Sequence, residues 1–117
     1  MKRLGIVGFG QFGQLAAGIL RRHFELFATD VAPAAEAAAR KLGVPFGSLR
    51  EAAARDVVVV AAPVAAMRGV FTSMAPHVKP GALVADVGSV KMLPARWMAE
   101  ILPAHADLVA THPLFGP

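Results

Sequence analysis

Gly8-Phe9-Gly10-Gln11-Phe12-Gly13 is the stretch of this sequence that decides its fold. It matches the pattern G-x-G-x-x-G, follows the apolar residues 4–7 directly, and opens a segment with helical spacing. We therefore expect a buried strand at residues 4–7 and a helix at residues 12–23. A glycine loop between a strand and a helix is the arrangement that holds the pyrophosphate of a dinucleotide.

Each glycine of the loop has its own physical reason. Gly8 permits the tight turn, Gly10 lets a pyrophosphate approach the backbone, and Gly13 lets the helix pack close to the strand. Amide N–H groups and the helix dipole then stabilise the phosphate charge. The predicted cofactor-binding residues of the loop are Gly8, Phe9, Gly10, Gln11, Phe12 and Gly13.

An acidic residue is expected about twenty residues further on, at the end of the second strand. Asp30 occurs there, seventeen residues after Gly13. A carboxylate at that position accepts hydrogen bonds from the ribose hydroxyls and repels a 2′-phosphate, so it favours NAD over NADP. Two alternatives stay open. Asp30 and the glycines can serve turns and a helix start only, and Arg40 or Lys41 can lie near enough to admit NADP.

The rest of the chain alternates strands with helices. After Pro33 an alanine-rich helix continues to Leu42 and Gly43, and residues 44–46 form at best a short edge strand. Alternation of this kind predicts an α/β fold, a doubly wound and mostly parallel sheet of the Rossmann type, in one domain spanning residues 1–117. The further predicted strands are 26–29, 57–61, 82–86 and 107–111, and the further helices 48–54, 64–74 and 94–102.

Composition excludes several classes of function. The chain has 117 residues, of which 56% are hydrophobic and 17% charged, enough apolar material for one core. It has no cysteine, its four histidines are scattered, and we expect no metal site. The net charge of +4 is spread along the chain, so we expect no nucleic-acid partner. The longest apolar run, 57–62, is too short to span a membrane, and we expect a cytoplasmic protein.

Three segments that follow predicted strands carry candidate chemistry, because strand carboxyl ends face the cofactor crevice in such folds. Ala62 and Pro63 follow the valine strand, either as a cofactor contact or as a plain turn. Ser89 follows the next strand, either as a helix N-cap or as a hydroxyl that orients substrate, nicotinamide or a catalytic histidine. Lys91 is either surface charge or a partner for an anionic group.

His112 follows the last predicted strand and precedes a proline-glycine turn. Its near-neutral pKa suits taking a proton from a hydroxyl while hydride leaves the same carbon. A structural histidine is the alternative at this position.

Together, Gly8–Gly13, Asp86-Val87-Gly88-Ser89-Val90-Lys91 and Thr111-His112-Pro113-Leu114-Phe115-Gly116-Pro117 resemble the prephenate and arogenate dehydrogenases. The resemblance covers essentially the whole chain, with the motifs in the same order. It implies an NAD(P)-dependent dehydrogenase of tyrosine biosynthesis, which oxidatively decarboxylates prephenate or arogenate. By the same resemblance His112 binds or deprotonates the substrate hydroxyl, and Ser89 positions that histidine and the nicotinamide. Asp30 matches the family's NAD-preferring acid, whereas the plant arogenate enzymes use NADP.

The resemblance also implies a helical C-terminal domain that provides the dimer interface and an arginine for a substrate carboxylate. This chain stops at Pro117, so we expect it to bind cofactor but to lack most of the substrate site, and to be inactive alone. Two other functions stay open. One is a two-domain dehydrogenase of the β-hydroxyacid type, and the other is a non-catalytic module that senses NAD or a nucleotide.

Overall fold

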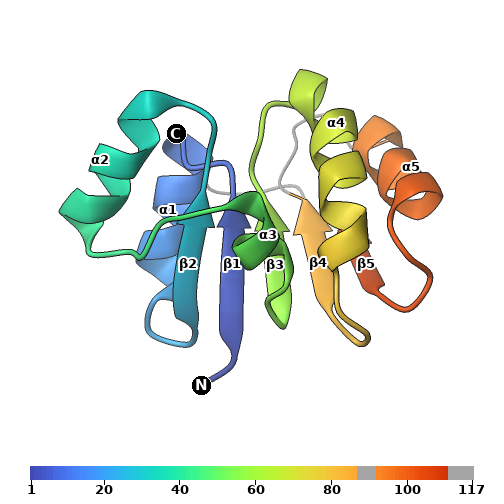
Figure 1. Cartoon of the computed structure of the whole chain (residues 1–117), viewed down its shortest axis with the longest axis horizontal. Helices are drawn as coiled ribbons and strands as arrows, with labels where there is room; N and C mark the ends of the chain where they lie inside the picture. Colours follow the sequence, from blue (N-terminus) through green and yellow to red (C-terminus); the bar gives the residue numbers. More distant parts are fainter. Residues whose placement is uncertain (87–91, 111–117) are drawn as a thin grey trace.

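A computed structural model of the chain describes residues 1–86 and 92–110. Five parallel strands form one sheet in the order β2-β1-β3-β4-β5 (Figure 1). All register pairs are in phase, so the carboxyl ends of the strands meet at one edge of the sheet. The strands are β1 (Arg3–Val7), β2 (Glu25–Thr29), β3 (Val57–Val60), β4 (Leu83–Asp86) and β5 (Asp107–Ala110).

Helices cover both faces of this sheet (Figure 1). The helices α1 (Gln11–Leu20) and α2 (Pro33–Leu42) pack on one face. The helices α3 (Leu49–Ala53), α4 (Val64–Met74) and α5 (Met92–Ile101) pack on the other. A short 3-10 helix, η1 (Ala75–His77), continues α4. The prediction of a doubly wound, parallel α/β sheet is therefore confirmed.

Side chains that point alternately to the two faces of each strand form the two apolar layers. In β1, Leu4 and Ile6 enter the layer beneath α1 and α2, whereas Val7 enters the layer beneath α3 to α5. In β3, Val58 and Val60 lie in that second layer, fully buried. A strand buried on both faces needs apolar residues at every position, which is why four consecutive valines form a central strand.

The strand order reverses between β1 and β3. The chain first moves outward from β1 to β2, and residues 44–46 then reach the outer edge of β2, where Phe46 forms one parallel bridge with Ala28. From α3 the chain crosses back to place β3 on the other side of β1. This reversal leaves a crevice at the carboxyl ends of β1 and β3, where ligands bind in open α/β sheets.

Most predicted elements are confirmed, with small errors at their ends. The first helix ends at Leu20, not at His23, because residues 21–23 form a turn in which His23 N–H bonds to the carbonyl of Leu20. That turn lets the chain reverse into β2. Residues 44–46 form a single bridge, as expected of a minimal edge strand, and η1 was not predicted.

Candidate functional site

A cavity of about 540 Å³ lies in the crevice between β1 and β3, at the strand carboxyl ends. The loops that follow β1, β2 and β3 all contribute to it. Its lining residues are Gly10, Gln11, Phe12, Asp30, Val31, Ala32, Ala61, Ala62, Pro63, Val64 and Ala66. The sequence-predicted residues of three separate segments therefore meet around one space.

Gly8 makes the turn that carries the chain out of β1. Its φ is +99°, in the left-handed region that residues with a side chain rarely adopt. A Cβ there would lie 2.7 Å from the carbonyl carbon of Ala61, so the loop after β1 touches the loop after β3. The Gly8 N–H also bonds to the carbonyl of Thr29 at 2.9 Å, which fixes the turn against β2.

Gly13 and Gly10 have different surroundings. A Cβ on Gly13 would lie 2.1 Å from the carbonyl oxygen of Gly8, so only glycine lets α1 approach the turn this closely. A Cβ on Gly10 would meet nothing within 4 Å, and Gly10 lines the cavity. Gly10 is also the N-cap of α1, with no side-chain cap and no acid in the first turn. The first amide groups of α1 are therefore available to an anion.

Asp30 joins the loop after β2 to the glycine loop. Its Oδ2 accepts a hydrogen bond from the Phe9 N–H at 2.6 Å, and its Oδ1 accepts one from the Ala32 N–H at 2.9 Å. The carboxylate is half-buried and lines the cavity. The contact with Ala32, the N-cap of α2, shows that Asp30 also has the structural role considered as an alternative.

The three other loop residues differ in where their side chains lie. Phe9 is 1% exposed and belongs to the apolar layer beneath α1 and α2. Its backbone N–H, not its ring, is the group at the site. Gln11 is exposed and Phe12 is half-buried, and both line the cavity.

Sequence reasoning missed two contributions to the site. Gln14 donates from Nε2 to the carbonyl of Phe9 at 3.0 Å and so braces the glycine loop. Its signal was a polar side chain in a helix whose other polar residue is Gln11. Val31 is fully exposed beside Asp30 and lines the cavity. The signal for it was a large apolar residue directly after Asp30, at the end of the second predicted strand.

Ala62 lies against the turn at Gly8, and Pro63 follows it at the start of α4. Both line the cavity of about 540 Å³ and a smaller adjoining one of about 130 Å³. The Ala61 N–H bonds to the carbonyl of Val7 at 2.7 Å, which extends the pairing of β1 with β3 to the cavity. Small residues here leave the space open.

Ser89, Lys91 and His112 lie outside the described residues. The strands that precede them are described. Asp86 ends β4 and pairs in register with Val60 on one side and Ala110, the end of β5, on the other. Asp86 is also fully buried. Strands β4 and β5 therefore end at the same edge of the sheet as β1, which the glycine loop follows.

Within residues 1–86 and 92–110, no group of three or more metal-ligating side chains comes together. The same part of the chain contains no helix long and apolar enough to span a membrane.

A family model described as the nucleotide-binding domain of prephenate dehydrogenase matches residues 16–117. The chain belongs to this family. The match starts within α1, after the glycine loop of residues 8–13. This membership agrees with the order of the motifs in the sequence. It favours the prephenate dehydrogenase family over the β-hydroxyacid type.

Individual relatives agree with this membership. A probable arogenate/prephenate dehydrogenase of Methanocaldococcus jannaschii is 38% identical over 67% of this chain, which corresponds to 18% of that protein. Arogenate dehydrogenase 1 of Arabidopsis thaliana is 30% identical over 98% of the chain and 19% of that protein. The chain thus spans about a fifth of the length of these relatives.

A solved structure extends the likeness to three dimensions. Prephenate dehydrogenase from Aquifex aeolicus, in complex with hydroxyphenyl propionate and NAD+, superposes with a TM-score of 0.85 at 27% identity. The superposition covers 97% of this chain and 42% of that one.

Proposed function

We propose that this chain binds NAD(H) over Gly8–Gly13 and that, within the whole protein, it serves a prephenate or arogenate dehydrogenase of tyrosine biosynthesis. The observation that carries the proposal is the meeting of Gly10, Asp30 and Ala62-Pro63 around one cavity. A pyrophosphate needs a close approach to backbone N–H groups, and Gly10 provides it because a Cβ there would occupy the open space.

Asp30 supports NAD rather than NADP as the cofactor. Its carboxylate lines the cavity with both oxygens already fixed by backbone N–H groups. Each oxygen has a second lone pair with which to accept a ribose hydroxyl. A 2′-phosphate would face this negative charge, with Val31 and Ala32 beside it in place of a basic side chain.

The chemistry of the reaction is a proposal from the sequence motifs. When bound, NAD+ supplies an acceptor for the hydride that leaves the carbon carrying the substrate hydroxyl. We propose that His112 takes the proton of that hydroxyl, so that a carbonyl forms as the hydride departs. Loss of the ring carboxylate as CO2 then gives an aromatic ring. Ser89 is proposed to orient His112 and the nicotinamide.

Cofactor binding is tested by titrating the 117-residue chain with NADH and following the fluorescence of the cofactor. We expect Gly10→Ala to weaken NADH binding at least about tenfold, because its methyl group takes up space needed by the pyrophosphate. Gly18→Ala is the matched control, since Gly18 lies in α1, the helix that Gly10 caps, and is exposed and unobstructed. Equal affinities for both variants would refute the proposed site.

The catalytic proposal is tested in the whole protein with His112→Asn. A catalytic histidine predicts that turnover falls by at least about a hundredfold while NADH binding is retained. A module that only senses NAD predicts that neither changes.

We also propose that the 117-residue chain alone does not turn over prephenate or arogenate. A normal rate from the purified chain would contradict this.

A further inference from the structure

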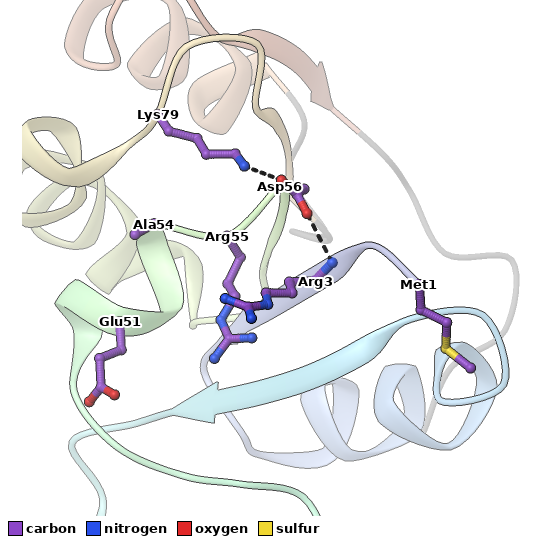
Figure 2. A pocket seen from close by; sticks show the side chains of 7 residues that line it. All are labelled: Met1, Arg3, Glu51, Ala54, Arg55, Asp56 and Lys79. Carbon is purple, nitrogen blue, oxygen red and sulfur yellow. Dashed lines mark hydrogen bonds and ion pairs between the residues drawn. The ribbon is translucent and has the colours of Figure 1, made fainter.

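A second cavity, of about 430 Å³, lies at the opposite edge of the sheet from the glycine loop. Arg3 begins β1, Asp56 directly precedes β3, and Lys79 lies before β4, so the cavity is at the amino ends of the strands. Figure 2 shows these side chains around it, together with Arg55 from the turn after α3. The remaining lining residues are Met1, Glu51 and Ala54.

The two acidic residues of this cavity, Asp56 and Glu51, both accept hydrogen bonds from nearby groups. Asp56 accepts from Lys79 Nζ through Oδ1 and from the Arg3 N–H through Oδ2 at 3.0 Å. Glu51 accepts from Ser48 N–H and Oγ–H as part of the capping box of α3. Its carboxylate points away from the basic side chains in Figure 2. Asp56 is paired with Lys79, and within the described residues neither Asp56 nor Glu51 forms an ion pair with the side chain of Arg3 or Arg55.

The two arginine side chains are weakly compensated. The guanidinium carbon of Arg55 lies 4.8 Å from the ring centre of Phe27, and within the described part of the chain no carboxylate forms an ion pair with it. Arg3 reaches Glu25 only at 3.9 Å, in a pair more than 60% exposed, which contributes little. Lys2 adds a further positive charge close to Asp56.

We propose that this cavity binds a small oxyanion with two or more negative charges, at a site separate from the cofactor. Arg3 and Arg55 both line the space, and their guanidinium groups carry planar forks of N–H donors that match phosphate and carboxylate oxygens. Phe27 holds Arg55 by stacking, so less side-chain freedom is lost on binding. Phosphate esters and polycarboxylates share this chemistry.

The site is tested by NMR on the labelled 117-residue chain, titrated with inorganic phosphate in one arm and with citrate in another. Sodium chloride keeps the ionic strength constant. We expect saturable shifts at Arg3, Arg55 and Lys79 in at least one arm, and the stronger arm identifies the class of anion. Because phosphate also suits the glycine loop, each arm is run with and without saturating NADH. The shifts at Arg3, Arg55 and Lys79 should be the same with NADH as without it.

Variants decide whether these residues form the site. We expect Arg3→Gln/Arg55→Gln to weaken the anion at least about tenfold, since charged hydrogen bonds are lost. The control Arg22→Gln/Arg96→Gln removes two exposed charges elsewhere and should leave the affinity unchanged. Arg55→Lys keeps the positive charge over Phe27, so it tests whether weaker binding comes from a folding defect. It should weaken anion binding less than Arg3→Gln/Arg55→Gln does. Unsaturable shifts, shifts confined to residues 8–13, or equal affinities in both double variants would overturn the proposal.

Discussion

The backbone nitrogen of Phe9 lies 2.6 Å from Oδ2 of Asp30, and this hydrogen bond joins the glycine loop to the end of the second strand. The other carboxylate oxygen holds the Ala32 N–H, so Asp30 is fixed between two loops of the site. A carboxylate that is already oriented loses little freedom when a ribose binds. The same contact makes the position of Asp30 sensitive to the shape of the glycine loop.

Replacing Asp30 with Asn tests this relationship. Asn keeps the size but has one acceptor oxygen, so one of the two N–H groups loses its partner, and the negative charge is removed. We expect NADH to bind about tenfold more weakly, since a hydrogen bond to a charged group is lost. The preference for NADH over NADPH should also shrink. Asp107→Asn, at an exposed acid on the opposite edge, is the control and should change neither affinity.

Gly13→Ala tests the close packing of α1 on the turn at Gly8. The new methyl group would lie 2.1 Å from a backbone oxygen, which cannot rotate away. We expect the free energy of unfolding in urea to fall by about 1–3 kcal/mol, with weaker NADH binding as the loop shifts. Gly18→Ala in the same helix should instead raise it by about 0.5–1 kcal/mol. Destabilisation by both variants to the same extent would contradict the packing argument.

Ser48→Ala tests the capping box that starts α3. Ser48 Oγ accepts the Glu51 N–H at 3.2 Å, and the Glu51 side chain accepts from Ser48 in return. We expect a loss of about 1 kcal/mol in the free energy of unfolding. The comparison is Ser73→Ala, an exposed serine near the end of α4, which should change stability by less than about 0.5 kcal/mol.

Asp56 predicts a pH-dependent contribution to stability. The hydrogen bond from Lys79, and then that from the Arg3 N–H, lower the pKa of Asp56 below its usual value. A carboxyl whose pKa is lower in the folded state stabilises the fold above its unfolded pKa, about 3.9, and loses this contribution as pH falls through the folded pKa. We therefore expect Asp56→Asn to be less stable than the unaltered chain at neutral pH. Urea unfolding from pH 7 to pH 2 should show the difference narrowing below about pH 4.

A difference between the two chains that stays constant down to pH 2 would show that the ionisation of Asp56 is not involved. Lys79→Met offers a second check, because it removes the main cause of the lowered pKa while Asp56 stays in place. With Lys79→Met in both chains, the difference in free energy of unfolding caused by Asp56→Asn should narrow at a higher pH, closer to the ordinary pKa of an aspartate.

The sheet and the cofactor crevice could be predicted because both depend on local patterns. A valine run such as Val57–Val60 indicates a doubly buried strand, and Gly8 to Gly13 has a spacing set by turn and packing geometry. The carboxyl ends of parallel strands meet at one edge, so Asp30 and Pro63 could be placed near the loop before their contacts were known.

Other features depend on contacts that no local pattern contains. Phe9 has its ring in the core, although its place in the motif made it a cofactor candidate, because the direction of a loop side chain depends on the packing around it. Arg3, Asp56 and Lys79 meet only because the amino ends of three strands align. The end of α1 at Leu20 is set by the reversal into β2.

The single bridge between Phe46 and Ala28 has a consequence for how copies of this chain can meet. Ala28 donates its N–H to the carbonyl of Pro45 and accepts from the Gly47 N–H, so the outer edge of β2 is already hydrogen-bonded near its carboxyl end. Pro45 has no N–H of its own to offer to a further strand. This side of the sheet is thereby protected against the edge-to-edge stacking that leads open sheets to aggregate.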